Sequence, residues 1–361
     1  MLNIDSIFEI QPYALVHKEK SQIYVDILKS LTQHHIETCP KYNKILNTLG
    51  FQVNKLNTIE DLPFIPVRLF KEYELLSVDK SQIIKTMTSS GTTGQSVSRI
   101  FLDKVTSSNQ TKALTKIVST FTGKKRLPML VIDTSAVIKD RNLFSARGAG
   151  ILGFSMLGYD IKYALDENMK LDMEGITAFL EKHNDETIML FGFTFMIWEH
   201  FYRVLKETGQ KLNLENSVLI HGGGWKKLID QAVDNECFKS SLNDVLGIKK
   251  VYNYYGMVEQ TGSIFMECEE GHLHASIFSD IIIRDHKDFR SVGKGEKGLI
   301  QLISLLPSSY PGHSILSEDM GELLGEDDCP CGRKGKYFKI HGRIKNAEVR
   351  GCSDTYAVRK P

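Results

Sequence analysis

The sequence predicts an α/β fold whose inner sheet is largely parallel. Three short apolar runs, LPMLVIDT, ETIMLFGF and SVLIHGGG, have the length and composition of buried strands, and segments with helical spacing lie between them. Strands that alternate with helices are typical of a parallel sheet covered by helices. Beyond residue 250 the chain is richer in glycine and turns, which predicts mixed or antiparallel strands there.

The first 77 residues are predicted to be mostly helical. Apolar positions recur at helical spacing in IYVDILKSL and YNKILNTL, whereas the two prolines of DLPFIPVRLFKEYELL predict an extended connection into a short helix. Internal repeats and low-complexity linkers are absent from the sequence. We therefore expect one large domain, with residues 1–77 as a helical segment packed on a core formed by residues 78–361.

Composition narrows the class of protein. The net charge of +1 argues against a nucleic-acid partner, because phosphate binding normally requires a strongly basic surface. No apolar run approaches the roughly 18–20 residues of a transmembrane helix, and the first residues, MLNIDSIFEIQPY, are unlike a signal peptide. We expect a cytoplasmic protein whose six cysteines are thiols, metal ligands or nucleophiles.

The most informative local feature is a loop rich in glycine and hydroxyl side chains that follows the apolar run IIKTM. Glycine lets the backbone approach a ligand closely, and amides and hydroxyls donate hydrogen bonds to phosphate oxygens. It is not a Walker A loop, because no GK[ST] follows, and a plain Ser/Thr-rich turn is the alternative. The candidate phosphate-binding residues are Thr88, Ser89, Ser90, Gly91, Thr92, Thr93 and Gly94.

Three further segments follow in order: YYGMVE at 254–259, LSEDMGELL around Asp319, and HGR at 341–343. With TSSGTTGQ they resemble the motifs of the adenylate-forming superfamily, which includes acyl-CoA ligases. The resemblance implies the large N-terminal domain of that fold, with mixed and parallel sheets flanked by helices, and it implies ATP and Mg²⁺ as ligands. In this reading Tyr255 and Gly256 lie by the adenine, Glu259 holds Mg²⁺, Asp319 binds the ribose hydroxyls and Arg343 contacts the nucleotide.

Within this superfamily, DLPFIP, CPCGRKGKYFKIHGR and the RG at 350–351 resemble the phenylacetate–CoA ligase branch. The segments LIHGGGWKK, YGMVEQTGS, CEEGHLH and EVRGCSD are more similar still to the bacterial acyl-protein synthetase family, the long-chain-fatty-acid–luciferin-component ligases. That resemblance covers nearly the whole chain. It implies that ATP activates a fatty acid, or another small carboxylic acid, to acyl-AMP. The acyl group would then pass to an enzyme cysteine and on to a partner such as an acyl-CoA-reductase-type protein.

Two departures from the acyl-CoA ligases bear on the second step. Those enzymes continue into a C-terminal lid domain with an adenylation lysine, and we expect this chain to lack that lid. The acidic pair that follows GR in phenylacetate ligases is Lys345-Asn346 here. Lys226, Lys227 and Lys345 are candidates to replace the lid lysine, and the sequence does not choose among them.

Cys352, in RGCSD, is the candidate nucleophile. A thiolate attacks an acyl adenylate well and gives a transferable thioester, and Arg350 would favour the thiolate form. An inert terminal cysteine is the alternative. Two rival functions also stay open: a phenylacetate-like acyl-CoA ligase that uses a lid from another chain, and an inactive nucleotide-binding scaffold.

A structural zinc site is predicted from two short turns, CEEGHLH and CPCG. Three sulfurs and one imidazole make a closed four-coordinate set, and Cys-Pro-Cys is a stiff turn that offers two sulfurs to one ion. His272 competes with His274, and the family's LH pattern favours His274. The predicted ligands are Cys268, His274, Cys329 and Cys331.

Weaker signals remain. In HGGGW, Gly223 either lets the chain approach adenine or acyl substrate or forms a tight strand-to-helix turn. Arg147 either meets a carboxylate or phosphate or is solvated. An aromatic series is interpreted as core for most of its members, with an acyl pocket as the alternative: Phe191, Phe193, Phe195 and Trp198.

Overall fold

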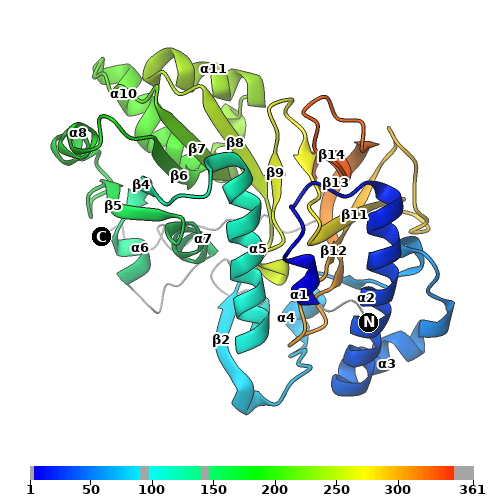
Figure 1. The fold of residues 1–361 in the computed structure, drawn as a ribbon. Helices are drawn as coiled ribbons and strands as arrows, with labels where there is room; N and C mark the ends of the chain where they lie inside the picture. Colours follow the sequence, from blue (N-terminus) through cyan, green and yellow to red (C-terminus); the bar gives the residue numbers. More distant parts are fainter. Residues whose placement is uncertain (1–3, 90–96, 140–145, 345–361) are drawn as a thin grey trace. The chain divides into compact units, whose positions relative to one another are not determined.

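The computed structural model describes residues 4–89, 97–139 and 146–344 of the chain (Figure 1). These residues form two compact units. Unit 1 holds residues 4–89, 97–117 and 256–344, and unit 2 holds residues 118–139 and 146–255. None of the described helices is long and apolar enough to cross a membrane.

Unit 2 contains the predicted parallel sheet, with strand order β8-β7-β6-β4-β5 and every neighbouring pair parallel. Each of the three apolar runs forms one of its strands, which confirms that prediction. The strands are β4 (Leu127–Thr134), β5 (Gly158–Leu165), β6 (Ile188–Phe193), β7 (Ser217–Gly222) and β8 (Lys250–Tyr255).

Helices cover both faces of this sheet, which explains why its strands are apolar throughout. One face carries a core in which Leu130, Leu190 and Leu219 meet side chains of α8, α11 and the helical segment that follows β6. On the other face, Phe154 of α7 stacks on Phe191 of β6 at 4.3 Å between ring centroids. The helices are α6 (Ala136–Lys139), α7 (Ala146–Ser155), α8 (Met173–Lys182), α9 (Thr194–Met196), the π-helix η5 (Ile197–Tyr202), α10 (Arg203–Thr208), the 3₁₀-helix η6 (Lys226–Gln231) and α11 (Asn235–Leu246).

The strands of unit 1 are mostly antiparallel, as expected for the region beyond residue 250. They follow the order β11-β12-β13-β14-β10-β9, and β1 joins β13 in parallel. A separate antiparallel hairpin is formed by β2 and β3. The strands are β1 (Ile65–Pro66), β2 (Ile83–Thr88), β3 (Arg99–Asp103), β9 (Phe265–Glu267), β10 (Leu273–His274), β11 (Ser279–Arg284), β12 (Lys297–Ser304), β13 (Ser314–Glu326) and β14 (Lys336–Arg343).

The helices of unit 1 lie chiefly in the N-terminal 77 residues, as predicted, and DLPFIPVRLFKEYELL gives a two-residue strand and then a short helix. Tyr24 and Leu28 of α2 pack on Ile282 of β11 and Ile303 of β12, so this helix covers one face of those strands. The helices are α1 (Ile4–Ile7), α2 (His17–Thr38), α3 (Pro40–Thr48), α4 (Leu69–Glu72) and α5 (Lys104–Thr122), whose residues after Ile117 belong to unit 2.

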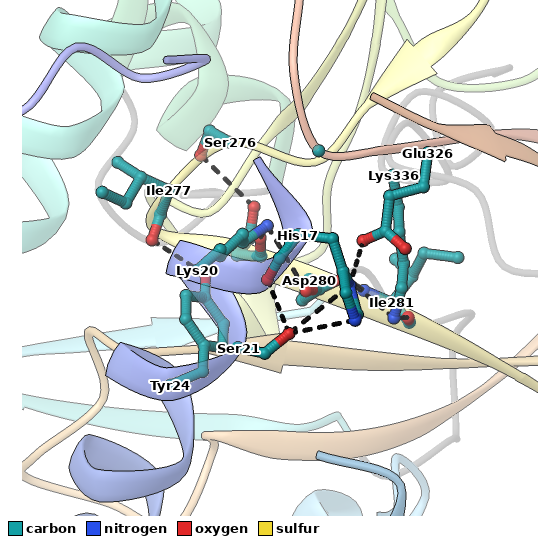
Figure 2. Close-up of polar contacts among 12 residues, drawn as sticks. His17, Lys20, Ser21, Tyr24, Ser276, Ile277, Asp280, Ile281, Glu326 and Lys336 are labelled. Atoms are coloured by element: carbon teal, nitrogen blue, oxygen red, sulfur yellow. Dashed lines mark hydrogen bonds and ion pairs between the residues drawn. The ribbon is translucent and has the colours of Figure 1, made fainter. Parts of the chain in front are cut away.

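A buried ion cluster fixes the start of α2 to the strands beneath it (Figure 2). The Lys20 ammonium lies 3.4 Å from one oxygen of Asp280, and the Lys336 ammonium lies 3.5 Å from the other. Each lysine also donates to a backbone carbonyl, Lys20 to Ser279 and Lys336 to Ile281. Burial lowers the pKa of Lys20, which the Asp280 carboxylate partly opposes. Two cations thus share one carboxylate in the interior of unit 1.

Candidate functional site

The hairpin of β2 and β3 carries the first residues of the glycine-rich loop. Thr88 ends β2 opposite Arg99 of β3. The backbone amide of Ser89 donates to the carbonyl of Ser98 at 3.1 Å, and the amide of Ser98 donates to the Ser89 hydroxyl at 2.9 Å. Ser90, Gly91, Thr92, Thr93 and Gly94 lie outside the described residues, so their phosphate-binding role stays a prediction.

Glu259 lies on the 3₁₀ turn η7 (Val258–Gln260), and surrounding hydrogen bonds fix this turn. The Tyr310 hydroxyl donates to the Glu259 carbonyl at 2.9 Å. The Gln260 amide donates to the carbonyls of Leu302 and Gly312 at 3.0 and 2.8 Å. Gly256, just before the turn, packs against Ile264, where a Cβ would lie 3.1 Å from its nearest side-chain carbon.

The Glu259 carboxylate is placed as a cation ligand would be. Only 3% of the residue is exposed, and its Oε1 has no hydrogen-bond partner among the described residues. A buried carboxylate oxygen without a partner is costly, and a hard cation such as Mg²⁺ removes that cost by accepting its lone pair. The donor set at Glu259 therefore fits the predicted metal.

Asp319 and Arg343 face each other across the β13–β14 pair. Arg343 Nε donates to Asp319 Oδ1 at 3.4 Å, and the two side chains are 38% and 13% exposed. Both groups therefore remain accessible to a ligand on unit 1. Strand register alone brings these two predicted nucleotide residues together, although 24 positions separate them in the sequence.

Unit 2 holds the other two predicted nucleotide residues, Gly223 and Tyr255. Gly223 has φ of +76°, and a Cβ on it would lie 3.1 Å from the Phe193 ring, so both conformation and space favour glycine. The Thr194 hydroxyl lies 3.0 Å from the Gly223 carbonyl and 3.0 Å from Nδ1 of His221. Burial lowers the pKa of His221 to about 3, so its ring is neutral and can donate to Thr194. This chain of hydrogen bonds fixes the loop at the end of β7.

The aromatic residues in β6 and just after it belong mostly to the core, as interpreted from the sequence. Phe191, Phe193 and Trp198 are 0%, 4% and 8% exposed, while Phe195 is partly exposed. Arg147 is buried and paired with the Asp133 carboxylate, with Nε at 2.9 Å from Oδ2. The alternative that Arg147 is solvated is therefore wrong, because this carboxylate of the protein itself binds it.

The four predicted metal ligands come together in unit 1. One ligand atom from each of Cys268, His274, Cys329 and Cys331 lies within 4.8 Å of every other. Cys268 begins the turn that follows β9, and His274 ends β10, while the two later cysteines lie between β13 and β14. The pairing of β10 with β14 brings the two segments together.

The chemistry of this cluster suits a cation. Burial raises the pKa of the Cys329 thiol to about 12, and the nearby Cys331 and Cys268 raise it further. Burial also lowers the pKa of His274 to about 4, which leaves the imidazole neutral, as a metal ligand must be. Nδ1 of His272 lies 3.3 Å from the Cys329 sulfur, so this competing imidazole borders the four-residue set.

Several predicted residues lie outside the described parts of the chain. These are the candidate nucleophile Cys352 together with Lys345, Asn346 and Arg350, and the side chains of Lys226 and Lys227 are likewise not described. Their roles stay predictions. Sequence reasoning overlooked Tyr310, which holds the Glu259 turn, because no local pattern distinguishes a structural tyrosine from one that supports a distant site.

Comparison with known proteins adds an independent line of observation. The family model for acyl-protein synthetase, LuxE, matches residues 2–359. A long-chain-fatty-acid–luciferin-component ligase of Vibrio harveyi is 23% identical over 360 residues, which span 97% of this chain and 91% of that relative. The ligase of the same name from Aliivibrio fischeri is also 23% identical, over 97% of this chain and 92% of its own length.

Among solved structures, similarity extends to 2-hydroxyisobutyryl-CoA ligase. Its open conformation, in complex with 2-HIB-AMP and CoA, gives a TM-score of 0.68 at 17% identity, over 92% of this chain and 77% of that one. Its thioesterification state gives the same TM-score at 18% identity, over 96% of this chain and 73% of that one. These matches confirm the predicted fold, that of the adenylate-forming ligases.

Proposed function

This chain belongs to the acyl-protein synthetase family and is a ligase, and from that premise we propose that it activates a fatty acid with ATP and carries the acyl group on Cys352. The observation that carries the proposal is the family match over residues 2–359. The names of the two full-length relatives, long-chain-fatty-acid–luciferin-component ligases, support a fatty acid as the substrate.

In the first step a carboxylate oxygen of the fatty acid attacks the α-phosphorus of ATP. The bond from that phosphorus to the bridging oxygen breaks, pyrophosphate leaves, and acyl-AMP forms. The amides and hydroxyls of residues 88–94 bind the β- and γ-phosphates of ATP in this proposal. Asp319 accepts hydrogen bonds from the ribose hydroxyls, and Arg343 contacts the nucleotide.

Glu259 holds the metal ion. Its buried Oε1, which has no partner in the described part of the chain, and the fixed geometry of its turn support this role. Bound Mg²⁺ would neutralise charge on the phosphates. Gly223, Tyr255 and Gly256 are assigned to the adenine, with Tyr255 contributing an aromatic face.

In the second step the Cys352 thiolate attacks the acyl carbonyl carbon, and AMP leaves. The resulting thioester is stable in water yet reactive toward another thiol, so it can pass the acyl group to a partner protein. An acyl-CoA-reductase-type protein is the proposed acceptor. Zinc, bound by Cys268, His274, Cys329 and Cys331, stabilises the fold and takes no part in either step.

Covalent labelling separates the two steps. Incubation with radioactive fatty acid and ATP should label the parent protein, and neutral hydroxylamine should remove the label. Cys352→Ala should keep ATP–pyrophosphate exchange but lose the label, whereas Cys237→Ala, which removes an exposed cysteine of α11, should change neither.

Each step has its own contradicting result. Normal labelling of Cys352→Ala would refute the role of that cysteine and leave the activation step standing. Release of a CoA thioester by this variant at the parent rate would instead favour an acyl-CoA ligase. A parent protein that binds ATP but forms no acyl-AMP would support the inactive nucleotide-binding scaffold.

A further inference from the structure

One arginine joins the two segments that carry the predicted metal ligands. Arg333 lies two positions after Cys331, and its guanidinium pairs with the carboxylate of Glu269. Glu269 directly follows Cys268 in the sequence. Arg333 Nη2 donates to Oε1 of Glu269 at 3.2 Å, and Nη1 donates to Oε2. This two-pronged ion pair, between residues 64 positions apart, therefore bridges the turn after β9 and the turn between β13 and β14.

The same guanidinium reaches the metal ligands themselves. It donates a hydrogen bond to the sulfur of Cys331. Burial raises the pKa of this thiol, but hydrogen bonds from the backbone and side chain of Arg333 and from the neighbouring thiols lower it below its usual value. The Cζ of Arg333 also lies 5.9 Å from the centre of the Tyr13 ring, which meets the His274 ring edge to face at 6.0 Å. Arg333 thus contacts one predicted ligand directly and a second through one aromatic ring.

The charge of the ligand set explains why a cation belongs at this position. Zinc with three thiolates and one neutral imidazole carries one net negative charge, and a buried net charge is costly unless a counter-charge lies near it. The Arg333 side chain is 15% exposed, whereas its partner Glu269 is 52% exposed, so water screens the carboxylate better than the guanidinium. The positive charge of Arg333 therefore acts on the sulfurs with less screening than the negative charge of Glu269.

We propose that Arg333 supports the metal site from outside its ligand set: it donates to the Cys331 thiolate, compensates the excess negative charge and, through Glu269, holds the two ligand-bearing turns together. This inference rests on the proposed function, because it takes zinc to be bound by the four ligands. Arg333 is a positioning residue, since it acts through Cys331. Arginine suits this task because its planar fork binds a carboxylate with two hydrogen bonds and keeps further N–H donors for a sulfur.

The affinity of the purified protein for zinc tests this role. Competition with a chromophoric chelator gives the zinc Kd of the parent protein and of Arg333→Met, which removes the charge and every donor. Loss of a hydrogen-bond partner of a metal ligand weakens metal binding by about 10- to 100-fold, and we expect a change of that size. Arg333→Lys keeps the charge but loses the fork, so its Kd should lie between the two. Arg290→Met is the matched control, because it removes an exposed arginine that pairs with Asp285 and Asp288, and its zinc Kd should equal that of the parent protein.

Cobalt in place of zinc gives a second readout that does not depend on stability. Co²⁺ with thiolate ligands absorbs in the near ultraviolet through charge transfer from sulfur to metal. A hydrogen bond to a sulfur lowers the energy of its electrons, so Arg333→Met should shift this absorption to longer wavelength. Arg333→Lys, which retains a donor, should absorb closer to the parent wavelength. A residue that only stabilises the fold would leave the wavelength unchanged.

If either the zinc Kd or the cobalt absorption of Arg333→Met stays at the parent value, the inference is overturned, even where the temperature of thermal unfolding falls. The same holds if Arg290→Met weakens zinc binding as much as Arg333→Met does. If Arg333→Met does not fold, the polar but uncharged Arg333→Gln decides, since a parent-like zinc Kd in that variant also overturns the inference. A parent protein that binds neither zinc nor cobalt would refute the metal site of the proposed function itself, so the two failures are distinguishable.

Discussion

In the buried ion cluster beneath α2, substitution of Asp280 should lower the free energy of unfolding more than substitution of Lys20. Lys20, Asp280 and Lys336 side chains are 3%, 4% and 7% exposed, so water screens none of them well. With both lysines charged, the cluster carries one net positive charge. Asp280→Asn raises that to two without changing the size of the side chain, whereas Lys20→Met lowers it to zero.

The magnitudes follow from the cost of isolating charge. Removal of one member of a buried ion pair costs about 3–5 kcal/mol, because the remaining charge is left uncompensated. Asp280 compensates two lysines, so Asp280→Asn should reach the upper end of that range. Lys20→Met leaves the pair of Lys336 and Asp280 intact and removes a cation whose pKa burial already lowers. Its cost should stay below about 2 kcal/mol, mainly that of the hydrogen bond to the Ser279 carbonyl.

Urea unfolding followed by far-ultraviolet circular dichroism measures these free energies for the parent and both variants. Glu72→Gln is the matched control, because the Arg68–Glu72 pair is exposed and 3.7 Å long, and its loss should cost less than about 0.5 kcal/mol. Equal destabilisation by Asp280→Asn and Lys20→Met would refute the argument from net charge. So would an Asp280→Asn protein as stable as the control.

Three further outcomes are expected. The purified parent protein should contain about one zinc per chain by elemental analysis, and a metal-free parent protein would contradict the site. Cys329→Ser should lose the zinc and unfold more readily, whereas Cys237→Ser, at an exposed cysteine, should keep it. Burial, with the nearby His34, lowers the pKa of His313 to about 3, so the unfolded state takes up the proton as the pH falls below 6.5. His313 should therefore cost about 2 kcal/mol of stability between pH 7 and pH 5, and His313→Gln should show a pH dependence smaller by that amount; identical pH profiles would exclude the effect. Gly94→Val should slow acyl-AMP formation, raising the free energy of its transition state by about 2–4 kcal/mol, while the circular dichroism spectrum stays unchanged. Acyl-AMP formation at the parent rate would show that this loop does not bind the phosphates.

The fold was predictable where the pattern is local. Parallel strands covered on both faces must be apolar throughout, so LPMLVIDT, ETIMLFGF and SVLIHGGG carry their own signal and become β4, β6 and β7. The grouping of the four predicted metal ligands was predictable for a similar reason. CEEGHLH and CPCG are short turns in which the spacing of cysteine and histidine is recognisable locally, although Cys268 and Cys329 are 61 positions apart in the sequence.

The rest depends on partners that no local pattern specifies. Lys20 stands in HKEKSQ, which has the composition of an exposed helix face, and only the docking of α2 on Asp280 buries it. Gln110 likewise lies among polar neighbours in SSNQTK, and its burial follows from the approach of Gly262. Polar residues of this kind acquire their roles from tertiary contacts, which override the preference for exposure.

The anchoring of α2 has a consequence for the order of events during synthesis. The first amide of this helix, that of His17, donates to the Asp327 carboxylate at 2.7 Å, a contact between residues 310 positions apart. At the usual speed of translation the ribosome needs roughly 15–60 s to add that many residues. Until β11 and β12 have been synthesised, Tyr24 and Leu28, which later pack on those strands, have no strands to cover. The N-terminal helix therefore reaches its anchored position only after Asp327 has been added, late in the synthesis of the chain.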